Sequence, residues 1–166
     1  MPVTIRNSTY VLDELCKNET ELPIRAHTTE TAGATEIIFA LFARLGYRFT
    51  PRLRDRGDRR LFTSGPIDRQ PSPHLQPQGT PRINRPRILD WWDDMLRVIG
   101  SMKLGWVTAS LCVQKLQASP QQNALAVALQ EYGRLGRTLQ SMRWYAYPEE
   151  RRRLLRQRNK GEALHA

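Results

Sequence analysis

The chain has 166 residues, which is enough for one hydrophobic core and too few for two. Apolar residues make up 40% of it, so we expect it to fold, whereas 11 prolines and 10 glycines argue against a continuous helical bundle. The formal net charge is +10, and a surface this basic attracts polyanions because their counterions are released on binding. Nucleic acid is therefore the expected partner, with a basic protein that has no specific partner as the alternative.

The first part of the chain reads as a short helix followed by an extended stretch. Apolar spacing predicts a helix over residues 8–18, and Ser8 has the side chain of a helix cap. Residues 21–29 then read as extended chain that leads directly to Glu30. This order would place an acidic side chain at the end of a strand.

The clearest amphipathic helix follows over residues 34–45. Gly46 comes directly after it, as expected of a residue that ends a helix in the left-handed conformation. Residues 47–50 alternate aromatic and polar side chains and predict a second short strand. Residues 1–51 therefore predict an α/β unit.

Residues 52–86 are expected to form a loop, because they hold six of the eleven prolines and few large apolar side chains. The arginines of this segment, Arg52 and Arg54 among them, could contact a DNA backbone. A solvated linker without such contacts is the alternative.

Residues 87–166 are predicted to be helical. The expected helices run over residues 88–99, from 107 to near Pro120, over 123–142, and from Pro148 onward, where Glu149 and Glu150 suit the positive end of the helix dipole. Helical spacing assigns to the core the apolar residues Ile88, Leu89, Trp92, Met95, Leu96, Ile99, Val107, Leu111, Leu116, Leu125, Leu129, Tyr132, Leu135 and Leu139.

Basic side chains gather toward the end of the chain and are candidates for phosphate contact. Arg152 and Arg156 are four positions apart and share one face of a helix. A solvated helix face is the alternative. The set expected to bind DNA here is Arg143, Arg152, Arg153, Arg156 and Lys160.

Two carboxylates are the candidates for chemistry. Glu30 follows a predicted strand and Glu162 lies on the last predicted helix, a layout in which two acidic side chains can meet and hold divalent metal. Ordinary surface carboxylates are the alternative. Cys16 and Cys112 lack metal-ligand spacing and are expected to be buried or half-buried thiols.

A set of longer motifs resembles the C-terminal part of the catalytic domain of Tn3-family DNA transposases. The similarity follows the family's order along nearly the whole chain, except for about residues 61–80. The motifs are TTETAG (28–33), LGYRFTPRLRD (45–55), WDDMLR (92–97), GSMKLG (100–105), EYGR (131–134), RRRLL (151–155) and NKGEALH (159–165).

The resemblance implies an α/β, partial ribonuclease H-like unit with a large, mostly helical insertion and an Asp-Asp-Glu triad that binds Mg²⁺ or Mn²⁺. Glu30 occupies the place of the family's second aspartate and Glu162 that of its final glutamate. Both would be catalytic and metal-binding. The implied activity is cleavage of transposon ends and their transfer to target DNA, in the bacterial cytoplasm and possibly with other transposase subunits as partners.

Two departures from the family pattern predict loss of activity. The first aspartate would precede Met1, and the chain ends soon after Glu162, so the sequence is expected to be a truncated remnant. Glu30 adds a methylene where the family has aspartate, which displaces the carboxylate by more than ~1 Å in a site that tolerates about 0.5 Å. One alternative is a non-enzymatic fragment that binds DNA or an intact transposase. Another is a helical interaction protein that does not bind DNA.

Overall fold

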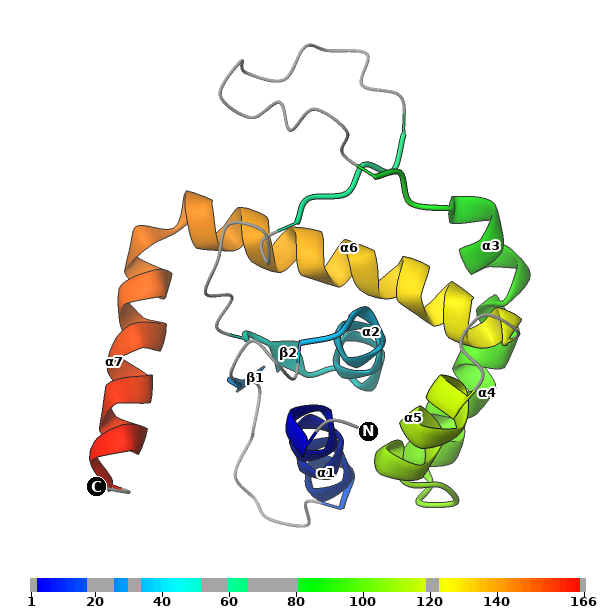
Figure 1. The fold of residues 1–166 in the computed structure, drawn as a ribbon, viewed down its shortest axis with the longest axis horizontal. Coiled ribbons are helices and arrows are strands. Elements are labelled where there is room, and N and C mark those ends of the chain that lie inside the picture. The colour runs from blue at the N-terminus through cyan, green and yellow to red at the C-terminus, as the bar shows by residue number, and fades with distance from the viewer. Residues whose placement is uncertain are drawn as a thin grey trace.

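The computed structural model describes residues 3–17, 26–29, 34–51, 60–65, 81–118 and 123–164, with the backbone alone for 3–7 and 157–164. Figure 1 shows a mostly helical molecule with a very small sheet. The helices are α1 (Val3–Cys16), α2 (Glu36–Leu45), α3 (Arg85–Asp90), α4 (Trp92–Lys103), α5 (Ala109–Ala118), α6 (Ala124–Ala146) and α7 (Pro148–Leu164). The strands are β1 (Ala26–His27) and β2 (Arg48–Phe49).

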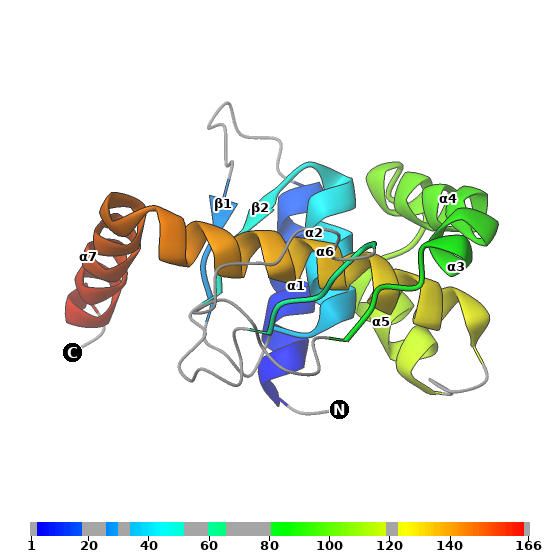
Figure 2. The same ribbon diagram turned by 90° about the horizontal axis from the view of Figure 1, so that it is seen from above.

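Helix α2 lies at the centre of the molecule, between α6 on one side and α1 on the other (Figures 1 and 2). Its position follows from its sequence, since seven of its ten residues are buried. Its ends are fixed locally: the Thr35 side chain accepts a hydrogen bond from the Ile38 amide, and Gly46 has φ 88°. The helix predicted over residues 34–45 and its glycine stop are therefore confirmed.

The two strands flank α2 in the chain and pair in parallel, with Ala26 opposite Arg48 and His27 opposite Phe49. A parallel pair requires a crossover connection, and α2 provides it. The imidazole of His27 stacks on Phe42 of α2 at 5.6 Å and on Phe49 at 6.3 Å between ring centres. This β1–α2–β2 unit is compatible with the predicted α/β class in a mostly helical molecule, while residues 18–25 of the predicted first helix and strand lie outside the described residues.

Helix α6 crosses α2 at a point where glycine is required. A Cβ atom at Gly133 would overlap the backbone carbonyl of Glu36, whereas one at Gly136 would meet Phe39 Cβ at 3.5 Å, an ordinary contact. Beside this crossing, Arg137 Nη1 donates to Glu36 Oε1 at 2.7 Å. The absence of a side chain at position 133 thus allows the two helices to approach and form this ion pair.

The far side of α2 is closed by α1 and α5. Asp13 of α1 is buried, and its carboxylate accepts hydrogen bonds from the Ala109 and Ser110 amides in the first turn of α5. The Tyr47 hydroxyl donates to the Leu15 carbonyl at 2.8 Å, which ties α1 to the end of α2. Polar contacts therefore set the place of α1, whose apolar residues complete the core.

Several predicted boundaries are wrong. Helix α1 begins five residues before Ser8, which is buried in its interior and is not a cap. The helix expected over residues 88–99 is two helices separated at Trp91, and it starts at Arg85, where Asn84 accepts from the Arg87 amide. Within the loop predicted over residues 52–86, residues 60–65 and 81–84 are described without a helix and form one isolated bridge between Thr63 and Arg82, whereas residues 85 and 86 already belong to α3.

Four of the expected core residues are exposed: Leu89 at 68%, Leu96 at 42%, Leu111 at 46% and Leu139 at 61%. Each lies on a helix whose buried face is narrower than its apolar stripe, so helical spacing alone overestimates the core. None of the helices, within the described part of the chain, is both long and apolar enough to span a membrane.

Candidate functional site

Helix α7 stands at one end of the molecule, beyond the end of α6 (Figure 1). Pro148 begins it, and the Arg151 amide donates to the Tyr147 carbonyl at 3.2 Å. Glu149 and Glu150 occupy its first turn, where the helix dipole favours negative charge. The predicted fourth helix is therefore confirmed.

Glu150 is the residue that joins α7 to the sheet. Its carboxylate forms an ion pair with Arg48 of β2, and its other oxygen lies 3.5 Å from Nε of Arg143 in α6. Burial, and then the charges of Arg143 and Arg153, hold the pKa of Arg48 below its usual value. One carboxylate is thus shared between two arginines, and the surroundings of α7 remain strongly positive.

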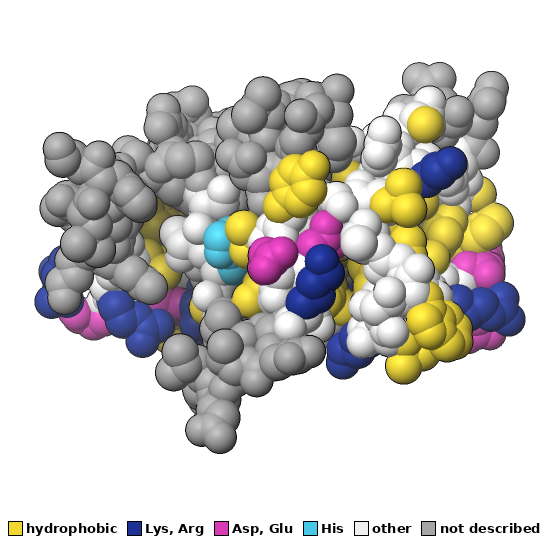
Figure 3. All heavy atoms as spheres, turned by 90° about the horizontal axis from the view of Figure 1, so that it is seen from below, with side chains coloured by type: hydrophobic (Ala, Val, Ile, Leu, Met, Phe, Trp, Pro, Cys, Tyr) yellow, Lys and Arg dark blue, Asp and Glu magenta, His cyan; other side chains and the backbone are white. Residues whose placement is uncertain are grey.

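The described arginines of the predicted DNA-binding set lie at this same end. Arg143, Arg152, Arg153 and Arg156 are all exposed, and Arg152 pairs locally with Glu149 at 2.6 Å. Figure 3 shows basic side chains at the end of the molecule where α7 lies. Arg52, Arg54 and the side chain of Lys160 lie outside the described residues. The arrangement suits contact with a polyanion without base recognition.

The structure describes the two candidate catalytic residues only in part. Glu30 lies outside the described residues, three positions after the end of β1. The backbone of Glu162 is part of the last turn of α7, and its side chain is not described. Among the described residues no group of three or more His, Cys, Asp or Glu side chains could hold a metal ion. The predicted pairing of Glu30 with Glu162 therefore remains a prediction.

The buried carboxylates Asp13 and Glu131 and the half-buried Glu36 are occupied by structural contacts. Asp13 binds the amides of α5, and Glu131 accepts from the Asn84 amide at 2.9 Å and pairs with Arg134. Glu36 pairs with Arg137. Because each already has donors, none of them is a free ligand for chemistry.

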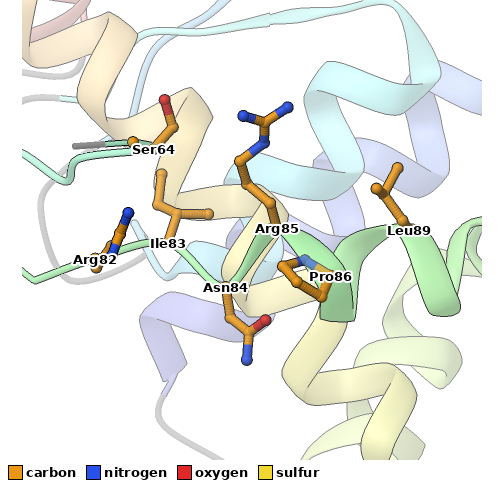
Figure 4. A pocket seen from close by; sticks show the side chains of 8 residues that line it. Ser64, Arg82, Ile83, Asn84, Arg85, Pro86 and Leu89 are labelled. Carbon is orange, nitrogen blue, oxygen red and sulfur yellow. The ribbon is translucent and has the colours of Figure 1, made fainter.

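A shallow cavity of about 700 Å³ lies at the edge of the predicted loop (Figure 4). Arg82 and Arg85 approach it from the chain that leads into α3, and Leu89 closes one side. The full lining in the described residues is Ser64, Gly65, Arg82, Ile83, Asn84, Arg85, Pro86 and Leu89. The lining contains no carboxylate or histidine that could act as a general base toward the Ser64 hydroxyl, so this cavity is not proposed as the active site.

The contact that sequence reasoning missed is the ion pair of Arg48 with Glu150. Arg48 is an ordinary polar position in a predicted strand, and Glu150 was explained by the helix dipole alone. No local pattern connects residues so far apart in the sequence.

Comparison with known proteins gives the same family along the whole chain. Residues 1–166 match the family described as Tn3 transposase DDE domain. The chain is 47% identical over 98% of its length to the transposase for transposon Tn2501 of Escherichia coli, and 47% identical over 97% to that for Tn501 of Pseudomonas aeruginosa. It is 40% identical over 96% of its length to the transposase for Tn1546 of Enterococcus faecium.

The chain spans 16% of the length of each of these relatives. No solved structure matches it significantly. Since the family match covers residues 1–166, the chain belongs to the Tn3 transposase DDE domain family.

Proposed function

We propose that this chain serves DNA transposition, as part of a catalytic domain that cleaves DNA at transposon ends and joins those ends to target DNA. The observation that carries the proposal is the family match over residues 1–166, together with relatives that are each described as the transposase of a transposon. A positively charged helix at one end of the fold supports DNA as the partner.

The finer fold assignment is also part of the proposal. The β1–α2–β2 unit would belong to a ribonuclease H-like sheet, and α3 to α6 would form the helical insertion between it and the last helix. The parallel pairing of β1 with β2 supports this assignment. The connection between the two parallel strands supports it as well, because it is made by a helix, α2.

Glu30 and Glu162 are the residues that would hold a divalent metal. Carboxylate oxygens are the ligands that Mg²⁺ and Mn²⁺ prefer, so the donor chemistry fits. A bound metal would stabilise the charge that develops on the phosphate. The longer side chain of Glu30 would misplace one ligand, and we therefore propose that strand transfer by this chain is strongly reduced.

The arginines of α7 would bind the DNA backbone away from the phosphate that reacts. Arg152, Arg153 and Arg156 are exposed on one helix and would bind backbone phosphates, which fixes the position of the duplex without reading its sequence. Arg143 would extend this contact onto α6. Arg52, Arg54 and Lys160 complete the proposed DNA path.

A segment exchange tests the catalytic proposal. The matched segment of the Tn2501 transposase is replaced by this chain, once as it stands and once with Glu30→Asp, and transposition of an element with Tn2501 ends is counted. We expect little transposition with Glu30 and recovery with Glu30→Asp, while Glu30→Asp combined with Glu162→Gln is inactive. Equal activity with Glu30 and with Glu30→Asp would contradict the assigned role.

DNA binding is tested on the chain itself. A fluorescent duplex is titrated with the 166-residue protein at several salt concentrations, and we expect the affinity to fall steeply with salt. A response that is flat in salt would contradict a phosphate-contact interface and favour a protein partner.

A second candidate function is binding to an intact transposase. It is favoured by the exposed apolar side chains near the junction of α6 with α7, namely Leu139, Met142, Tyr145 and Tyr147. Added to cells with an active relative, the chain would then lower transposition. Replacing Leu139 and Met142 with Ser should abolish this effect and leave DNA binding unchanged.

A further inference from the structure

The attachment of α7 to the rest of the fold is narrow. Helix α7 follows directly on α6, packs against its end and otherwise projects from the body of the molecule (Figures 1 and 2). Leu154 is only partly buried and Leu155 is 37% exposed, so the part of α7 whose side chains are described offers little apolar surface to hold it in one orientation. Its orientation must depend on polar contacts.

The ion pair between Glu150 and Arg48 is the contact that joins α7 to the sheet. The side chains of Arg48 and Glu150 are 32% and 16% exposed, so the pair is substantially desolvated. Arg143 of α6 reaches the second oxygen of the same carboxylate. Glu150 therefore connects three elements, β2, α6 and α7, at a single point.

Arg48 also occupies a special place in the sheet. It is paired with Ala26 of β1, the strand that leads to Glu30 within four residues. On the other side, Glu150 is followed by an unbroken helix up to Glu162, which at 1.5 Å per residue is about 18 Å of rigid chain. The two halves of the proposed metal site are thus joined through Arg48 and Glu150.

We infer that Arg48 and Glu150 are positioning residues that fix α7, and with it Glu162, relative to the strand that leads to Glu30. The inference rests on the proposed function for the roles of Glu30 and Glu162. The clamp formed by Arg48 and Glu150 is itself a property of the fold. The clamp acts by charge. Glu150→Gln tests this, because it keeps the size of the side chain and removes its charge-based attraction to the arginines.

Spin-label distances test the clamp in the 166-residue chain. With Cys16→Ser and Cys112→Ala as background, labels at Ala43→Cys and Arg156→Cys report the distance from α2 to α7, since both positions are exposed. We expect one narrow distribution that broadens or shifts with Glu150→Gln and with Arg48→Gln. The double variant should be no broader than Glu150→Gln alone, because that change already removes the pair with Arg48.

Glu149→Gln is the matched control. Glu149 lies in the same turn, has the same charge and pairs only with Arg152 of its own helix among the contacts described. It should leave the distance distribution unchanged. An unchanged distribution with Glu150→Gln would overturn the inference, and so would loss of the whole helical signal, because a clamp on α7 leaves the α2–α6 core intact.

The segment exchange adds the functional arm. In the hybrid that carries Glu30→Asp, Glu150→Gln should lower transposition on the order of a hundredfold, as expected when a catalytic group is displaced by about 1 Å, and Glu149→Gln should not. If Glu150→Gln loosens α7 while every hybrid is inactive, the proposed function fails and the clamp stands. If α7 stays fixed while the hybrid is active, the clamp alone fails.

Discussion

Gly133 of α6 lies so close to the backbone carbonyl of Glu36 in α2 that no side chain fits at this position. The obstacle is backbone in the buried centre of the fold and cannot move away as a flexible side chain would. Gly133 therefore determines how closely α6 can cross α2.

Gly133→Ala should lower the free energy of unfolding by about 3 kcal/mol or more, since the two helices must separate to admit the methyl group. Gly136→Ala is the matched control, because its Cβ would meet Phe39 at an ordinary 3.5 Å and alanine favours a helix by about 1 kcal/mol over glycine. Urea unfolding followed by circular dichroism measures both. Equal destabilisation at 133 and 136 would contradict this account of the crossing.

Asp13→Ala should destabilise the chain by about 1–3 kcal/mol, because the Ala109 and Ser110 amides lose a buried acceptor. Asp13→Asn keeps an acceptor oxygen and should cost less. The control is Asp93→Ala, an exposed acidic residue in the first turn of α4, for which a change within about 0.5 kcal/mol is expected. The same unfolding assay measures all three.

His27 should make the stability depend on pH. Burial between aromatic rings lowers the pKa of His27 below 6.5, so the unfolded chain takes up a proton at a higher pH than the folded chain does. The free energy of unfolding should therefore fall as the pH drops below about 6.5, until the folded state is protonated too. His27→Phe retains the stacking and should remove this part of the pH dependence. A pH profile identical in both proteins would refute the assignment to His27.

Cys112 should resist thiol reagents in the folded protein. Burial raises its pKa to about 11, so little reactive thiolate exists near neutral pH, and its side chain is also inaccessible. Cys16 is less buried and should react first, although burial raises its pKa too. Mass spectrometry after timed labelling at pH 8 gives both rates, and denaturant should bring Cys112 close to the rate of a free thiol.

Arg153→Gln with Arg156→Gln should weaken DNA binding and lower the slope of log affinity against log salt by about 1.8, if each arginine neutralises one phosphate. Arg87→Gln with Arg97→Gln changes the net charge equally but lies on α3 and α4, at the other end of the molecule. This control should have a much smaller effect. Equal losses in the two double variants would indicate that only the net charge matters.

Sequence reasoning predicted what is determined locally. Helix α2 was recognised because its apolar stripe and glycine stop lie within a few residues of one another. Helix α7 was recognised because proline and two acidic residues mark its start. The family is likewise confirmed, and the small parallel sheet is compatible with the α/β class. DNA contact by the basic residues of α7 remains a prediction.

What escaped prediction depends on distant parts of the chain. Gly133 in a helix reads as a weak position until α2 is placed against it. Leu139 was assigned to the core from its helical spacing, but spacing within one helix does not show which neighbours pack against it. It is 61% exposed in the described structure. The ion pair of Arg48 with Glu150 joins residues that no sequence period connects. The predicted roles of Glu30 and Glu162 remain predictions.

The close crossing at Gly133 also gives α6 a point around which the helix could tilt. The helix has 23 residues, or about 34 Å, and is closest to α2 somewhat before its midpoint. A tilt of about 5° around that fulcrum would move its far end, where α7 begins, by about 2 Å. A strain applied near α3 and α4 would thus reach Glu150 as a displacement in the opposite direction.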